Sequence, residues 1–143
     1  MAISWKIVLP MIGMALALTA GRMVADWSTP DETPEPLAAG FTAFSDERYS
    51  RAEALFEAAR LRDPDNGDVY HGLALVALAR HGDRARAEAL FRQAIGAPSV
   101  SPVAFANFGR FLINEQRSDE AIPVLEAGVA RDPGFEPVRA RLA

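Results

Sequence analysis

The 143-residue sequence predicts an all-α fold, in which an N-terminal transmembrane or signal helix precedes a solenoid of about three helical hairpins and a short capping helix. Three observations predict it. The letters RAEALF occur at residues 51–56 and again at residues 86–91. Apolar residues around both copies recur at spacings of three and four, as on one face of a helix. An uncharged run covers residues 7–21, the layout of a signal sequence or a short membrane anchor.

The first expected element is a membrane helix within residues 1–27. Trp5 and Trp27 bracket the uncharged run, and a helix between them spans about 33 Å, against a hydrocarbon core of about 30 Å. Lys6 and Arg22 then lie where long side chains reach the lipid headgroups. This geometry favours a single-pass anchor, which we place in a bacterial inner membrane. Lys6 and Arg22 nearly balance in the positive-inside count, so the orientation rests on the signal-type layout, which leaves the short N-terminus in the cytoplasm and the rest of the chain in the periplasm.

Two alternatives for this segment stay open. Residues 15–17 form an A-x-A site, so a signal peptidase can cleave the segment and leave a soluble periplasmic protein. If the helix is retained, Gly13, Ala17 and Gly21 recur every four residues and form a small-residue face suited to packing against other membrane helices.

Residues 28–36 predict an extended linker. The run DWSTPDETPEP at residues 26–36 holds three Pro and four acidic residues and has little to bury. Its last residue, Pro36, suits the first turn of a helix. We expect the repeat domain at residues 37–143, with units at about 35–66, 67–101 and 102–134 and a cap at 135–143.

Composition excludes several functions. Residues 26–143 hold 13 basic and 19 acidic side chains, a formal net charge of −6, which argues against nucleic-acid binding. The chain has no Cys, and it contains no H-E-x-x-H, Walker or G-x-G-x-x-G motif. His71 and His81 are too far apart on one helix to share a metal ion. We therefore expect no catalytic residue, metal, cofactor or small-molecule substrate.

A period near 34 residues organises the remainder of the chain. Small residues recur upstream of each copy, and an A-x-x-x-F pair with a third small residue recurs downstream. The matching positions are 40, 74 and 109; 52, 87 and 121; 56, 91 and 125; and 59, 94 and 128. The phrase RDP at 62–64 returns at 131–133. This pattern resembles the tetratricopeptide repeat family, whose units are helical hairpins that stack in series.

Within each unit, a polar turn separates the two predicted helices: FSDERYS, ARHGDRA and NEQRSDE. The second unit carries one extra residue, which we place in its turn. Pro64 and Pro133 end the second helices, and Asp68 and Ser101 are expected to cap the helices that follow. We expect the small residues to let paired helices approach, and the large residues of the second helices to fill the gap toward the next pair.

The resemblance implies a groove lined by the first helix of each unit, where another polypeptide binds. The family's groove positions correspond to Leu37, Phe41, Phe44, His71, Leu75, Leu78, Ala106, Arg110, Ile113 and Asn114. Family members that clamp a C-terminal carboxylate use paired Lys and Asn in the groove. This chain has Leu37, Phe41 and His71 instead, so we do not expect that activity. The alternative is ordinary core packing for the apolar members of this set, and we expect His71 to be a hydrogen-bonded surface residue.

Two functions remain open. One is a membrane-tethered scaffold that recruits proteins or helps assemble an envelope complex, for which c-type cytochrome or respiratory complex biogenesis is an example drawn from the resemblance. The other is a permanent small accessory subunit of a membrane complex. In both cases we expect protein partners, namely subunits of a membrane complex.

Overall fold

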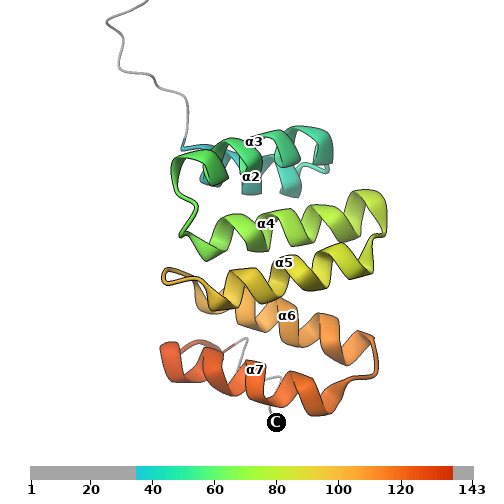
Figure 1. The fold of residues 1–143 in the computed structure, drawn as a ribbon, viewed down its shortest axis with the longest axis vertical. Helices are drawn as coiled ribbons and strands as arrows, with labels where there is room; N and C mark the ends of the chain where they lie inside the picture. The colour runs from blue at the N-terminus through green and yellow to red at the C-terminus, as the bar shows by residue number, and fades with distance from the viewer. Residues whose placement is uncertain (1–34, 137–143) are drawn as a thin grey trace, which may run out of the picture. The chain divides into compact units, whose positions relative to one another are not determined.

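The computed structural model describes residues 35–136, which form a stack of helical hairpins (Figure 1). The first hairpin pairs α2 (Pro36–Ser45) with α3 (Tyr49–Arg62). The second pairs α4 (Gly67–Val76), continued by the π-helical turn η1 (Ala77–His81), with α5 (Arg84–Gly96). The third pairs α6 (Pro102–Asn114) with α7 (Ser118–Arg131). The described part of the chain is thus all-α, with one isolated bridge between Asn66 and Ser99.

The predicted anchor (residues 1–27), most of the predicted linker and most of the predicted cap (residues 135–143) lie outside the described residues. This includes the anchor positions Trp5, Lys6, Gly13, Ala17, Gly21, Arg22 and Trp27. Among the helices of residues 35–136, none is both long and apolar enough to cross a membrane.

Helix boundaries follow local chemistry, with one correction. Pro36 begins α2, as its fixed backbone angle favours. The expected cap Asp68 is wrong: Asn66 caps α4 by accepting from the Asp68 backbone N–H at 3.0 Å. The Asp68 carboxylate instead accepts from the backbone N–H and the hydroxyl of Ser101, at 3.1 and 2.7 Å. Asp68 therefore ties the start of one hairpin to the start of the next.

The turns within the three hairpins share one left-handed residue. It is Glu47 in the first, Gly82 in the second and Gln116 in the third, with φ of 59°, 61° and 62°. The residue after it donates its N–H to a carbonyl five residues earlier in the first and third turns, but six earlier in the second, where Asp83 bonds to Ala77. The extra residue of the second unit is accommodated by the wider π-helical turn immediately before Gly82.

The equivalent large residues of the second helices occupy equivalent buried places. Phe56, Phe91 and Leu125 are 0, 1 and 1% exposed. A β-carbon added to Gly40 would come within 2.6 Å of the Phe56 ring, and one added to Gly72 in the next hairpin within 2.5 Å. Phe56 therefore fills the gap toward the following hairpin, which confirms the expected packing.

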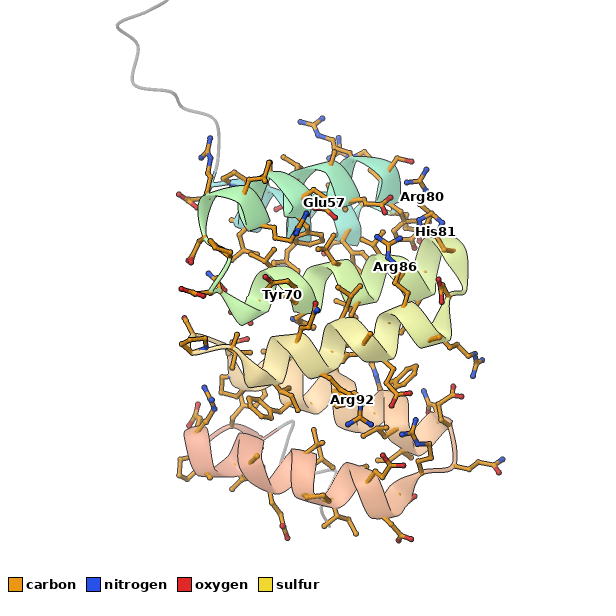
Figure 2. All side chains as sticks on the ribbon, viewed as in Figure 1. Glu57, Tyr70, Arg80, His81, Arg86 and Arg92 are labelled. Atoms are coloured by element: carbon orange, nitrogen blue, oxygen red, sulfur yellow. The ribbon has the colours of Figure 1, made fainter. Side chains whose placement is uncertain are left out.

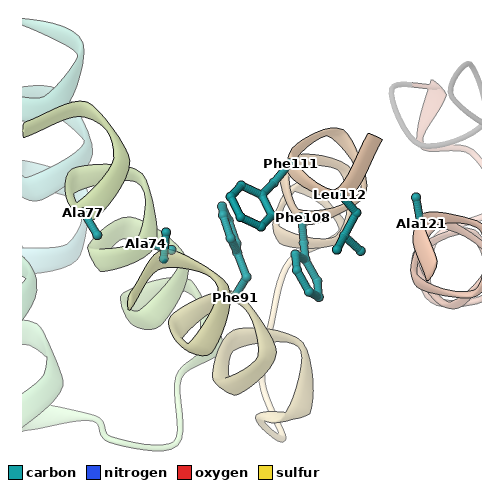
Figure 3. Close-up of a cluster of buried hydrophobic side chains, with 8 residues drawn as sticks. Ala74, Ala77, Phe91, Phe108, Phe111, Leu112 and Ala121 are labelled. Atoms are coloured by element: carbon teal, nitrogen blue, oxygen red, sulfur yellow. The ribbon is translucent and has the colours of Figure 1, made fainter. Parts of the chain in front are cut away.

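Phe91 repeats this arrangement one layer further along (Figure 3). Its ring points toward α6, where it stacks on Phe108 with ring centroids 5.4 Å apart and meets Phe111 at 5.7 Å. Ala74, Ala87 and Ala121 complete the same cluster. Each hairpin thus buries its apolar side against the next, since no single hairpin can cover that side alone.

Ion pairs join successive hairpins on the side of the second helices. The Glu53 carboxylate on α3 pairs with Arg80, His81 and Arg86 of the second hairpin, which lie close together at one edge of the stack (Figure 2). One repeat later, the Glu88 carboxylate accepts hydrogen bonds from both terminal nitrogens of Arg117, at 2.7 and 2.9 Å. Hydrogen bonds from Arg117 and then from Arg92 lower the pKa of Glu88 to about 2.

Candidate protein-binding face

The first helices of the hairpins form the inner side of the stack. Contacts join α2 to α4 and α4 to α6, whereas no Cα atoms of α3 and α5, or of α5 and α7, approach within 8 Å. A stack whose first helices touch and whose second helices spread apart curves toward the first helices. We call the solvent side of α2, α4, η1 and α6 the inner face.

The structure places the ten predicted groove residues in three environments. Leu37, Phe41 and Phe44 are half-buried and pack against the core around Phe56, and Leu75 and Leu78 are half-buried against the core around Phe91. His71 and Ala106 are buried. Arg110, Ile113 and Asn114 are exposed on α6. The exposed groove positions are thus concentrated on the third hairpin, and those of the first two hairpins pack against the core.

Charge is distributed unequally between the two sides of the stack. The first helices, PLAAGFTAFS, GDVYHGLALV and PVAFANFGRFLIN, carry only Asp68 and Arg110 as formal charges. Every second helix carries at least four charged side chains. Asp68 is bonded to Ser101 between hairpins, and Arg80 of η1 pairs with Glu53 of α3. Arg110 is therefore the charge on these helices that has no ion-pair partner among the described residues.

His71 and Asn107 form a polar contact between the second and third hairpins. His71 is 3% exposed, and its Nε2 lies 2.8 Å from Asn107 Nδ2. The ring also faces Phe41 and Phe91, with centroids 5.6 and 6.2 Å away. The expectation of a surface histidine is therefore wrong, because the neighbouring hairpins cover the ring.

Burial sets the protonation state of this histidine. Desolvation lowers the pKa of His71 to about 4; the charge of Asp68 opposes this shift and that of Arg110 adds to it. His71 is neutral at neutral pH, so one ring nitrogen accepts a hydrogen bond. With Asn107 Nδ2 as donor, the accepting nitrogen is Nε2. The pair satisfies two polar groups inside a mostly apolar region.

Sequence reasoning missed two residues of the inner face. Asn107 stands at the repeat position that Gly72 holds in the second unit, and only its contact with His71 distinguishes it. Val103 is 40% exposed on α6, comparable with Ile113 at 39%. A helical spacing signal was present for Val103, because it lies three residues before Ala106 and seven before Arg110.

The described residues contain no group of three or more His, Asp or Glu side chains placed to hold a metal ion. Their buried polar side-chain atoms all have hydrogen-bond partners.

Comparison with known families agrees with this architecture. The tetratricopeptide repeat profile matches residues 43–97, from the end of α2 to the end of α5. Residues 43–97 thus belong to the tetratricopeptide repeat family. Tetratricopeptide repeats generally serve as protein-interaction modules without enzymatic activity. No curated protein matches this sequence.

Two solved structures share this fold. PilF of Pseudomonas aeruginosa matches with a TM-score of 0.66 at 22% identity, over 75% of this chain and 49% of that one. YrrB, a tetratricopeptide repeat protein with an unusual peptide-binding site, matches with a TM-score of 0.61 at 19% identity, over 85% of this chain and 61% of that one. This chain thus spans about half the length of PilF, and at these identities the likeness establishes the fold alone.

Proposed function

We propose that this protein is an interaction scaffold whose inner face holds a segment of another protein. The observation that carries the proposal is the charge distribution: the first helices are almost free of charge, and two of the large exposed hydrophobic side chains, Val103 and Ile113, lie on α6. Apolar surface that a folded domain leaves accessible is typical of a binding site.

The chemistry of the face defines what it holds. Phe41 and Leu75 are half-buried, so they are held in place by the core and still present apolar surface. Val103 and Ile113 are exposed and are removed from water only when a partner covers them. A segment with apolar side chains, helical or extended, fits such a surface. Family membership supports the same conclusion.

A matched pair of variants tests this proposal. Ile113 and Ile122 are 39 and 48% exposed, the first on α6 and the second on α7. We expect Ile113→Asp to abolish recovery of the native partner from detergent-solubilised membranes and Ile122→Asp to leave it intact, with both variants melting near the wild-type temperature. Equal recovery with both variants would remove α6 from the binding surface.

We further propose that the N-terminal segment tethers the scaffold to an inner membrane and that the repeats act in assembling an envelope complex. The support is the sequence layout: an uncharged run over residues 7–21 between Trp5 and Trp27, with Lys6 and Arg22 beside it. Sequencing the mature N-terminus tests retention, and protease added to intact spheroplasts tests topology. A mature chain that starts after residue 17 would refute the tether.

A permanent accessory subunit is the second candidate, favoured by the spacing of Gly13, Ala17 and Gly21, which suits close packing of membrane helices. Mild-detergent purification separates the two roles. Stoichiometric recovery of one complex throughout growth identifies a subunit, and recovery that is substoichiometric and confined to the period of complex synthesis identifies an assembly factor.

A further inference from the structure

Within residues 35–136, Arg110 differs from most arginines in having no acidic partner among the described residues. Eight of the arginines within residues 35–136 either pair with a carboxylate or lie over an aromatic ring: Arg48, Arg60, Arg80, Arg84, Arg86, Arg92, Arg117 and Arg131. Neither an ion pair nor a hydrogen bond joins Arg110 to any described residue. It is exposed, and it is the only charged residue of α6.

On α4 and α6, the first helices nearest to Arg110, no free carboxylate is available to it. Its neighbours one turn away on α6 are Ala106, Asn107, Ile113 and Asn114, none of which is charged. On the adjacent first helix α4 the one carboxylate, Asp68, is bonded to Ser101. Asn107 is engaged by His71. The guanidinium therefore keeps its donors available on a helix that carries no other charge.

Apolar side chains flank this charge along the same helix face. Val103 precedes Arg110 by seven residues and Ile113 follows it by three, spacings that place all three on one side of an α-helix. Both apolar side chains are about two-fifths exposed. The accessible part of the inner face thus presents a cation between two apolar contacts.

We propose that the inner face selects a peptide segment in which an Asp or Glu side chain lies between apolar residues, with the carboxylate on Arg110 and the apolar residues on Val103 and Ile113. This inference rests on the proposed function and names the chemistry of its partner. An arginine fork binds a carboxylate with two parallel hydrogen bonds, so the pair fixes the register of the segment as well as attracting it. We assign a side-chain carboxylate rather than a chain terminus because apolar contacts lie on both sides of Arg110.

Peptide arrays with blocked ends test the proposal on the full-length protein in detergent. Each peptide carries a central Glu with Leu at one to four residues on either side, and matched sets carry Gln or Lys at the centre. N-acetylation and C-amidation remove the terminal charges. A further set carries central Gln with a free C-terminal carboxylate. Affinities of the best peptides are then measured by fluorescence anisotropy.

We expect Glu-centred peptides to bind about three- to tenfold more tightly than their Gln counterparts, and Lys-centred peptides to bind weakest. Salt should reduce the preference for Glu. Arg110→Gln should remove the preference. Arg51→Gln should retain it, because Arg51 is an exposed arginine on α3 that likewise has no carboxylate partner among the described residues.

Three results would overturn this inference: equal binding of Glu and Gln peptides, a Glu preference that survives Arg110→Gln, or tighter binding of the peptides with a free C-terminus. The proposed function has a separate readout. If Ile113→Asp still loses the native partner, the inner face binds protein and only the acidic specificity is wrong. If Ile113→Asp keeps the partner and no Glu-centred peptide binds, both proposals fail.

Discussion

The ring of Phe56 lies against Gly72 of the following hairpin so closely that a β-carbon there would come within 2.5 Å of ring carbons. Gly40 of its own hairpin is almost as near, at 2.6 Å. Two helices therefore converge on one buried ring, and the absence of side chains at both positions permits the contact. This relationship joins the first repeat to the second.

Gly72→Ala is expected to lower the free energy of unfolding by about 1–3 kcal/mol, because the ring or the helix must move to admit the methyl group. Gly96→Ala is the control. Gly96 is the last residue of α5, and a β-carbon there meets nothing within 4 Å. Urea denaturation should show the Gly96 variant unchanged or up to about 1 kcal/mol more stable. Equal effects at the two sites would contradict the packing described for Phe56.

The burial of His71 predicts a loss of stability in mild acid. Its pKa is lowered to about 4 in the folded protein from the ordinary histidine value of 6.5, so between these values the unfolded chain binds the extra proton. The unfolding free energy should therefore fall as pH decreases from 6.5 to 4, by about 3 kcal/mol in total.

His71→Gln keeps a hydrogen-bonding side chain beside Asn107 without this titration. Chemical denaturation of both proteins at about pH 7 and about pH 4.5 measures the difference. The variant should show a clearly smaller decrease. A wild-type decrease that the variant reproduces in full would mean that other groups cause the acid sensitivity.

Glu88 predicts a second pH range in which the protein loses stability, here because a paired carboxylate loses its negative charge rather than because a buried histidine gains a positive one. Because Arg117 and Arg92 lower its pKa from 4.5 to about 2, its contribution to stability is present above pH 4.5 and is lost as pH falls through about 2. Glu88→Gln should cost about 1 kcal/mol at neutral pH, a value that allows for solvent screening at this exposed site, and less at high salt.

The control for Glu88 is Glu126→Gln on α7. Glu126 is exposed, and its carboxylate pairs with no Lys, Arg or His among residues 35–136. Its replacement should therefore change stability by no more than about 0.5 kcal/mol. If the two variants were equally stable, the contact between Glu88 and Arg117 would not hold the second and third hairpins together.

Substitutions at two of the left-handed turn positions are expected to change stability in opposite directions. Gly82→Ala places a β-carbon at φ 61° and should destabilise the protein by about 1 kcal/mol. Gln116→Gly relieves the same strain at φ 62° and should be neutral or stabilising by about 0.5 kcal/mol. Thermal melting of both variants checks the prediction. A stabilising Gly82→Ala would contradict it.

The repeat period predicted the architecture because packing repeats with it. Phe56, Phe91 and Leu125 must each fill the same gap in consecutive layers, so their spacing along the chain determined where they lie in space. The one-residue insertion was also readable, since it lengthens the interval from Ala74 to Ala87 by one residue relative to the other two units. Its accommodation by a π-helical turn was not, because a longer loop would satisfy the same count.

Features that depend on distant partners could not be predicted. The contact of His71 with Asn107 joins residues 36 apart, and the pairing of Glu88 with Arg117 spans 29 residues. The true cap of α4 is one of several polar candidates near residue 66, and only hydrogen-bond geometry selects Asn66 over Asp68. For the groove residues, the period predicted the helix face but not the degree of burial, which depends on the adjacent hairpin.

The central claim is that the inner face is the partner-binding surface, and a photo-crosslinking residue placed at Ile113 tests it most directly. The same residue at Ile122 reports the outer side of α7, and each is combined with Arg110→Gln. We predict that Ile113 crosslinks one partner in native membranes, that Ile122 does not, and that Arg110→Gln weakens the crosslink. Crosslinking of that partner from Ile122 but not from Ile113 would contradict the account.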